Sequence, residues 1–167
     1  EVSVLALASP TVWYAADIPN EKLYRTMDGG LSWEDQILDN LLDATPAPAL
    51  PVWDLAVAPD DPAFVVAVTN DRQGVYLSED GGDTWDHLNI GATAGWDPAI
   101  LIADVAVSPL YNGDGERDIA VATRLPDGST DGDVWVLRVG VIGTWNGQGL
   151  GMDVSCVAFS PNYSQDE

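Results

Sequence analysis

Two aspartates stand where a glycoside-cleaving site could be built. Asp54 and Asp104 each begin a short run of small apolar residues, and Trp96 and Tyr111 are candidate exposed aromatics that could stack on sugar rings. Cleavage of a glycosidic bond needs two carboxyl groups roughly 5–9.5 Å apart, so both aspartates would have to face one cleft. The aspartate recurs together with its strand, however, and we therefore expect it to cap the start of that strand.

Acidic loops supply the candidate metal ligands. Asp114, Glu116 and Asp118 lie in a loop rich in oxygen donors, and a second such loop spans residues 127–133. Ca²⁺ is held by about six to eight oxygen ligands. Neither loop has the residue spacing of an EF-hand or its distal glutamate. A solvated acidic loop is the expected state, with Ca²⁺ as the alternative, and no other cofactor is expected.

Nucleophilic catalysis has little support in the sequence. His87 is the only histidine and Cys156 the only cysteine, so neither a Ser-His-Asp nor a Cys-His arrangement suggests itself. A single cysteine also excludes an intrachain disulfide. Because Val157, Ala158 and Phe159 follow Cys156, we expect this cysteine to be a small buried hydrophobe within a strand.

The charge of the chain is strongly negative. Acidic residues number 27 and basic residues only 6, which gives a net charge of -21. Nucleic acid and anionic membrane surfaces are both bound through clustered Lys and Arg, so neither is expected as a partner. No apolar run approaches the roughly 18 residues of a membrane span, so we expect no membrane insertion. Cationic partners, divalent ions or simple solubility fit this charge.

A repeated motif is the dominant signal in the sequence. The pattern Ser/Thr-x-Asp-x-Gly-x-Ser/Thr-Trp occurs at 26–33 and again at 78–85. Its defined residues are Thr26, Asp28, Gly30, Ser32 and Trp33 in the first copy, and Ser78, Asp80, Gly82, Thr84 and Trp85 in the second. We expect the aspartate to accept hydrogen bonds from amides two or three residues ahead, the glycine to allow a tight turn, and the tryptophan to cover it. Because the same residues recur, a structural role is favoured over catalysis.

Repeats of about 50 residues with four short strands each are typical of propeller blades. We therefore predict an all-β fold of β-propeller blades with four antiparallel strands and little helix. Blades are expected at residues 1–48, 51–95 and 100–148, with the start of another at 151–167, about three and a third blades in all. The proline-rich stretch 44–51 would link the first two. Propellers close with about four to eight blades, so the remaining blades are expected from the same longer chain or from other subunits.

The two motif copies resemble the BNR/Asp-box repeat family at every defined position, and the resemblance covers nearly the whole chain. It implies a propeller fold but leaves the function open. The family includes sialidases, xyloglucan-degrading glycoside hydrolases, sortilin-type receptor ectodomains and a photosystem II assembly factor. The Ser-Pro-Asn-Tyr sequence at 160–163 is similar to secreted or cell-surface bacterial members, which implies an extracellular or cell-surface location.

Two of the family's functions depend on basic residues that this chain would have to supply. Sialidases resemble one another in holding a substrate carboxylate with three arginines beside a Tyr–Glu pair, and no such triad can be assembled here. The arginines are Arg25, Arg72, Arg117, Arg124 and Arg138. These five and one lysine also do not supply the basic patch expected of the photosystem assembly relatives.

We therefore expect a non-catalytic extracellular or cell-surface module for protein or glycan binding or for surface assembly. The alternative is part of a secreted glycoside hydrolase, xyloglucanase- or sialidase-like, whose catalytic residues lie partly outside this segment. Two carboxylates facing one aromatic-lined cleft would favour the enzyme.

Overall fold

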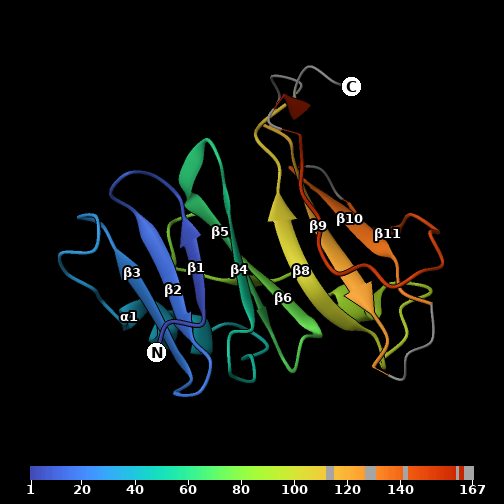
Figure 1. Cartoon of the computed structure of the whole chain (residues 1–167), viewed down its shortest axis with the longest axis horizontal. Helices are drawn as coiled ribbons and strands as arrows, with labels where there is room; N and C mark the ends of the chain where they lie inside the picture. Colours follow the sequence, from blue (N-terminus) through green and yellow to red (C-terminus); the bar gives the residue numbers. More distant parts are fainter. Residues whose placement is uncertain (112–114, 127–130, 141–142, 161, 164–167) are drawn as a thin grey trace. The chain divides into compact units, whose positions relative to one another are not determined.

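The computed structural model describes residues 1–111, 115–126, 131–140, 143–160 and 162–163. The chain divides into two compact units, Glu1–Leu88 and Asn89–Glu167, which are described separately. Their regular secondary structure is almost entirely antiparallel strands (Figure 1). Among the described residues, no helix is both long and apolar enough to span a membrane.

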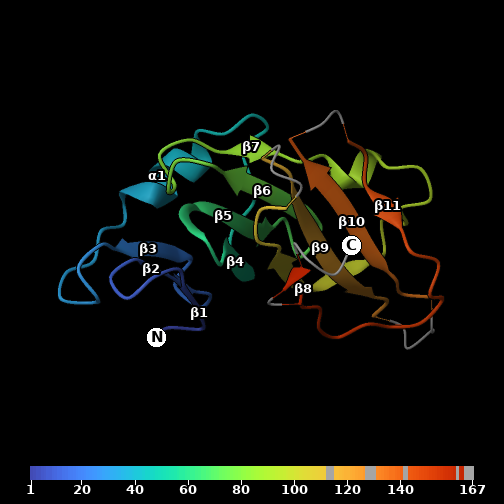
Figure 2. The same cartoon turned by 90° about the horizontal axis from the view of Figure 1, so that it is seen from above.

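The first sheet contains three strands in the order β1-β2-β3. They are β1 (Val4–Leu7), β2 (Trp13–Asp17) and β3 (Lys22–Thr26). A single bridge between Arg25 and Glu34 stands where a fourth strand was expected. The chain then enters the helix α1 (Gln36–Leu42), which packs beside β3 (Figure 2). The helix forms because Ile37, Leu38 and Leu41 share one face and are buried.

The second sheet has four strands in the order β4-β5-β6-β7. They are β4 (Asp54–Ala58), β5 (Asp61–Thr69), β6 (Gly74–Ser78) and the short β7 (Asp86–His87). Val, Ala and aromatic residues dominate these runs, and such residues fit a pleated and buried surface. The register of β4 on β5 shifts between Val57 and Ala58.

One hydrophobic core joins the first sheet, α1 and the second sheet. Tyr14, Ala16 and Leu23 of the first sheet meet Val65, Ala67 and Tyr76 of the second within this core, and Ile37, Leu38, Leu41, Val52, Leu55 and Trp85 complete it. The helix was not expected, because its short apolar pattern lies outside the strand repeat. It contributes Ile37, Leu38 and Leu41 to this core.

The second unit holds a four-stranded sheet in the order β8-β9-β10-β11. After the short 3-10 helix η1 (Ile90–Ala92), the strands are β8 (Leu101–Val107), β9 (Arg117–Arg124), β10 (Val134–Val139) and β11 (Asn146–Gly147). Residues 151–160 form no strand, although the Val154 amide donates to the Thr123 carbonyl at the end of β9 (3.0 Å).

The all-β prediction with antiparallel sheets is confirmed, although the first sheet has three strands rather than four. The prediction for Cys156 was wrong, because this residue is exposed and lies outside any strand. Its apolar neighbours look like a strand in sequence, but no partner strand pairs with them in the part of the chain that the structure describes.

Candidate functional site

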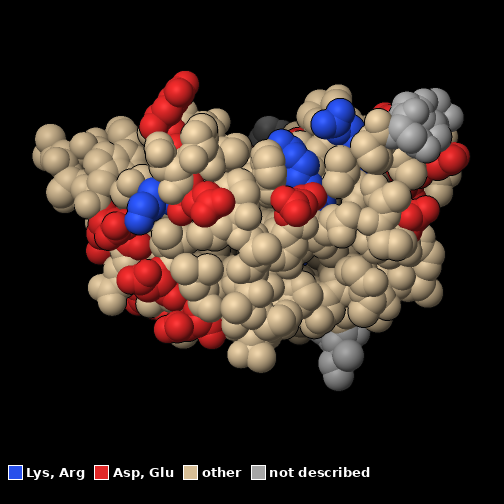
Figure 3. All heavy atoms as spheres, turned by 90° about the horizontal axis from the view of Figure 1, so that it is seen from below, with Lys and Arg blue, Asp and Glu red and all other residues tan. Residues whose placement is uncertain are grey.

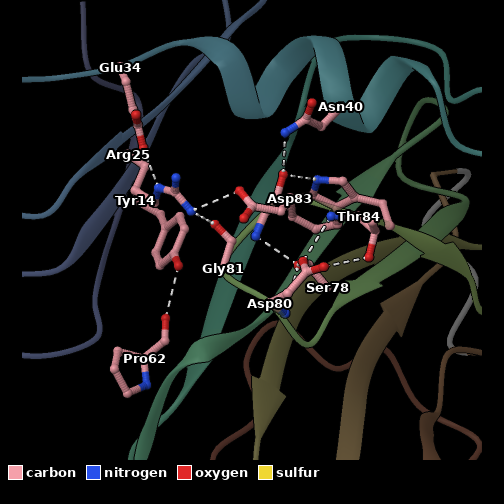
Figure 4. Close-up of polar contacts among 12 residues, drawn as sticks. Tyr14, Arg25, Glu34, Asn40, Pro62, Ser78, Asp80, Gly81, Asp83 and Thr84 are labelled. Atoms are coloured by element: carbon pink, nitrogen blue, oxygen red, sulfur yellow. Dashed lines mark hydrogen bonds and ion pairs between the residues drawn. The ribbon is translucent and has the colours of Figure 1, made fainter.

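The second motif turn, residues 78–85, is closed by the side chain of Asp80 (Figure 4). Asp80 Oδ1 accepts hydrogen bonds from the Ser78 hydroxyl and the Thr84 amide, both at 2.8 Å. Its Oδ2 accepts one from the Thr84 hydroxyl at 2.6 Å. The Ser78 oxygen in turn accepts from the Gly82 amide at 2.7 Å. The carboxylate therefore has three donors within its own turn.

The first motif turn, residues 26–33, has the same arrangement. Asp28 accepts from the Thr26 hydroxyl (2.8 Å), the Ser32 amide (2.8 Å) and the Ser32 hydroxyl (2.6 Å). The hydrogen-bonded amide lies four residues ahead, at Ser32, and the Leu31 amide, three residues ahead as predicted, also stabilises the carboxylate. Gly29 and Gly30 have φ angles of +73° and +88°, which turn the chain back toward the carboxylate.

Side chains of the first sheet and α1 brace the second motif turn from outside (Figure 4). A guanidinium nitrogen of Arg25 donates to the Gly81 carbonyl at 2.5 Å, and Asn40 donates to the Gly82 carbonyl at 3.0 Å. Arg25 also forms ion pairs with Asp83 at 3.5 Å and with Glu34, which belongs to the same blade as Arg25. The turn is therefore part of the contact between the two sheets of the first unit.

The motif carboxylates have pKa values below their ordinary range. The pKa of Asp28 lies at about 2, chiefly because the Ser32 hydroxyl and amide donate to it and stabilise the charged form. For Asp80, burial raises the pKa, but the donors from Thr84 and Ser78 together outweigh it, so the net direction is downward. Both groups are charged acceptors at neutral pH, as a turn-closing role requires.

Replacing Asp28 with asparagine is expected to make the free energy of unfolding depend less on pH in the acid range. A carboxyl whose pKa falls on folding stabilises the fold above its ordinary pKa of 3.8, and this stabilisation is lost as the pH falls toward about 2. Urea unfolding measured from about pH 5 to about pH 2 should show wild type and Asp28→Asn converging as acid is added. Ser32→Ala, which removes the main donor, should flatten the same range. Parallel curves for wild type and both variants would contradict this assignment.

A second polar cluster surrounds Asp118 in the second unit. Asp118 Oδ1 accepts from the Tyr111 hydroxyl at 2.7 Å and from Arg138 Nε at 3.4 Å, and Oδ2 accepts from the Tyr163 hydroxyl at 2.7 Å. Arg138 also stacks over the Tyr111 ring, 5.2 Å from its centre. Asp118 itself is buried. The cluster ties the segment at Tyr163 to strands β9 and β10.

The geometry of this cluster does not favour a tyrosine nucleophile. Burial, with the hydrogen bond to Asp118 second, raises the pKa of Tyr111 well above its ordinary value of 10.0. The phenol is therefore a neutral donor at physiological pH, whereas nucleophilic attack needs the deprotonated form. The hydrogen bond to Asp118 raises the pKa of Arg138, so this side chain stays charged.

The predicted metal ligands Glu116 and Asp118 contact side chains of the chain itself. Asp118 receives three donors, and Glu116 Oε2 lies 3.9 Å from a guanidinium nitrogen of Arg138. A bound cation would have to compete with that guanidinium for both carboxylates. Asp114 and residues 127–130 of the second acidic loop lie outside the described residues. The described part of the chain holds no group of three or more His, Cys, Asp or Glu side chains placed to bind a metal ion.

The predicted ligand-binding aspartates lie in different units, and both bind backbone amides. Asp54 accepts from the adjacent Leu55 amide at 2.9 Å, and Asp104 accepts from the Val157 amide at 2.7 Å. These contacts match the expected role at strand starts for Asp54, whereas Asp104 lies within β8 and holds the chain segment that follows the sheet. The structure does not assemble them into one cleft within either unit.

The aromatic prediction was wrong for Tyr111. Only 2% of Tyr111 is exposed, so its ring cannot stack on a sugar. Trp96 is half-buried and its ring meets that of Trp135 edge-on, with centres 5.5 Å apart. The exposed tryptophan is instead Trp33, of which 41% is accessible although the motif predicted it to cover its turn.

A pocket not anticipated from the sequence lies beside the second motif turn. It has a volume of about 340 Å³ and is lined by Asn40, Asp43, Ala44, Thr45, Asp83, Thr84, Trp85 and Asp86. Its aspartates give it an acidic character. Only the packing of α1 on the second sheet brings the two groups of residues together, so no pattern in the sequence could have indicated it.

The surface carries few basic groups. On the face in Figure 3, the Lys and Arg atoms are scattered among acidic and uncharged ones and form no continuous patch. Arg25, Arg117 and Arg138 each donate to carboxylate or carbonyl oxygens of the chain itself. Most of the described Asp and Glu residues are exposed, so the acidic excess of the composition lies at the surface.

Comparison with known proteins gives the fold. No protein-family model and no curated protein matches the sequence. Among solved structures, YCF48 bound to D1 peptide matches with a TM-score of 0.52 and 13% identity, covering 87% of this chain and 39% of that one. An ancestral GH74 enzyme matches with a TM-score of 0.58 and 17% identity, covering 98% of this chain and 22% of that one. The GH74 xyloglucanase from Xanthomonas campestris matches with a TM-score of 0.54 and 18% identity, covering 87% of this chain and 22% of that one.

The chain thus spans well under half the length of each of these structures. Structural matches at sequence identities this low indicate a shared fold but do not indicate a shared activity. Together with the antiparallel sheets of three, four and four strands, they show that this chain is built of β-propeller blades.

Proposed function

We propose that this chain is a non-catalytic Asp-box propeller module, located outside the cell or on its surface, that binds a protein partner through its acidic surface. The observation that carries the proposal is the engagement of the carboxylates that were candidates for ligand or metal binding. Asp54, Asp104 and Asp118 all accept hydrogen bonds from the chain itself. The motif aspartates Asp28 and Asp80 are occupied in closing their turns.

The charge supports a partner with basic groups. A net charge of -21 raises the local concentration of cationic ligands and speeds their association. A protein segment rich in Lys and Arg is the simplest such ligand, because cationic glycans are uncommon. A YCF48 propeller has been solved with a bound D1 peptide, which supports peptide binding as a use of this fold.

The second candidate function is a part of a glycoside hydrolase. It is favoured by the two GH74 structures above, one of which matches over 98% of this chain. In that case the catalytic pair would be completed by residues outside this segment. Asp54 or Asp104 would then be the carboxylate that this segment contributes.

The two functions are separated by paired assays on the native protein purified from its source. Release of reducing ends from xyloglucan and of sialic acid from sialyllactose tests hydrolysis, and an array of Lys/Arg-rich and Asp/Glu-rich peptides tests binding. We expect no sugar release, and retention of basic peptides at about 0.05 M salt that weakens by about 0.5 M, because salt screens exposed charges. Sugar release that Asp54→Asn or Asp104→Asn abolishes would support the hydrolase. Equal retention of basic and acidic peptides would contradict a cationic partner.

The proposed location has a separate test. Protease added to intact source cells should remove the protein if it is exposed at the surface, and antibody detection reports the loss. A cytoplasmic protein of the same cells serves as the control that the cells remain closed. Full protection of both proteins would overturn the surface location.

A further inference from the structure

One face of the first sheet is apolar and uncovered in the first unit. Side chains alternate across a strand, and Val4, Ala6, Tyr14, Ala16 and Leu23 point into the core shared with the second sheet. The opposite set forms what we call the open face: Leu5, Leu7, Trp13, Ala15, Tyr24 and, beyond β3, Trp33. Leu5, Leu7 and Trp33 are exposed. A hollow of about 220 Å³ on this side is lined by Val2, Ala15, Tyr24 and Trp33.

The same positions of the second sheet are covered by a neighbouring blade. In the register of the strands and the motif, the open-face residues correspond to Leu55, Val57, Val65, Ala67, Tyr76 and Trp85. All six belong to the core that packs on the first sheet or lie against it. Within the first unit, a sheet face of this composition thus already serves as the docking surface for a blade, since the second sheet packs in this way on the first.

Any blade that docks on the open face must differ from the first blade at the position of Arg25. In the contact between the two sheets, Arg25 donates to the Gly81 carbonyl and pairs with Asp83. The residue of the first motif that corresponds to Asp83 is Leu31, which is 89% exposed. A guanidinium placed against Leu31 would keep Glu34 of its own blade but would lose the Asp83 carboxylate and face an apolar side chain instead, which is unfavourable.

The other two sheets show what can stand at the Arg25 position. Strand pairing aligns Arg25, which faces Tyr14, with Leu77 of β6, which faces Val66. In the second unit the same place belongs to Val136 of β10. An aliphatic residue is therefore the more frequent choice in this chain, and Leu31 is suited to meet it.

We propose that the open face is the docking surface of a further propeller blade whose third strand carries an aliphatic side chain at the position of Arg25. The proposal rests on the proposed function only in taking the chain as a propeller module. The occupant is not the first blade of a second copy, because that copy would bring Arg25 onto Leu31 and would join two chains that each carry a net charge of -21.

The test joins an extra copy of residues 1–50 ahead of Glu1 of the full chain, which keeps the repeat in register. Four fusion proteins combine Arg25 or Arg25→Leu in the added copy with Leu31 or Leu31→Asp in the original blade. Each carries Leu7→Cys in the original blade and Cys156→Ser, so that the rate of thiol labelling reports coverage of the open face. The unfused chain with the same cysteine changes gives the rate for an uncovered face.

Matched pairs should protect the cysteine. We expect Arg25→Leu with Leu31, and Arg25 with Leu31→Asp, to label at least about tenfold more slowly than the unfused chain, because labelling then requires local opening. The two mismatched fusions should label faster than the matched ones. Circular dichroism of all four establishes that the sheets are folded, since Leu31 is exposed and its replacement should leave the blade intact.

Three results would overturn the proposal. Labelling of all four fusions at the unfused rate would mean that the face does not take a blade. Equal protection in all four would remove the requirement for an aliphatic residue. A concentration-dependent dimer of the unfused chain in sedimentation, with labelling of Leu7→Cys slowed as the dimer forms, would make a second copy the occupant. None of these measurements uses a peptide or a sugar, so they are independent of the binding and hydrolysis assays.

Discussion

Trp85→Ala is expected to lower the free energy of unfolding of the first unit by about 3–5 kcal/mol, the usual effect of truncating a buried aromatic residue. Only 6% of Trp85 is exposed, and it belongs to the core between the first two sheets. Its indole nitrogen donates to the Gly82 carbonyl at 3.2 Å, so the substitution also removes a hydrogen bond inside the turn. Urea unfolding followed by far-ultraviolet circular dichroism measures the change.

Trp33→Ala is the matched control at the same position of the first motif. Trp33 is 41% exposed on the open face, so its truncation should cost no more than about 1 kcal/mol in this chain. The two substitutions remove the same atoms, and the difference between them reports the coverage by a neighbouring blade. Equal losses for both variants would contradict the assignment of Trp85 to a core between blades.

Gly82→Ala is the second substitution with a large expected effect. Gly82 has a φ of +99°, which a residue with a Cβ adopts at a penalty of roughly 1–2 kcal/mol. The added Cβ would also lie 2.9 Å from Ile37 Cγ2, a buried side chain of α1. Overpacking adds about 1–3 kcal/mol, so we expect a total loss of about 3 kcal/mol in the free energy of unfolding.

The matched control for Gly82→Ala is Gly30→Ala. Gly30 has a φ of +88°, and a Cβ there would lie 2.9 Å from the Trp13 ring. Trp13 belongs to the open face and is only half-buried, so it has room to move and the backbone strain of roughly 1–2 kcal/mol should dominate. A loss for Gly30→Ala as large as that for Gly82→Ala would show that packing against α1 contributes nothing.

The contrast between the two motif turns bears on function. Their internal hydrogen bonds agree, yet Gly81 and Gly82 are bound by Arg25 and Asn40 of the neighbouring blade, whereas Leu31 and Trp33 of the first turn are exposed. The second motif copy thus serves both as a turn and as a surface on which the preceding blade docks. A structural use of this kind is consistent with the recurrence of the motif along the chain.

The sequence by itself determined the repeat, most of the strands and the closure of the two turns. Asp28, Asp80 and the glycines beside them act within eight-residue segments, and such local contacts follow from residue type and spacing. The alternating Val and Ala residues likewise indicated the strands of each sheet. Helix α1 was not predicted from the sequence, because its seven residues break the repeat and gain their stability from burying Ile37 and Leu41.

Only the tertiary structure decided which polar residues meet. Tyr111, Asp118, Arg138 and Tyr163 form one cluster although long stretches of chain separate them, and their sequence neighbourhoods suggested sugar stacking and metal binding instead. The brace of Arg25 on Gly81 likewise depends on how two sheets pack. Spacing along the chain encodes contacts within a strand or turn, whereas contacts between sheets depend on register and on the side chains that fill the core, which no single segment specifies.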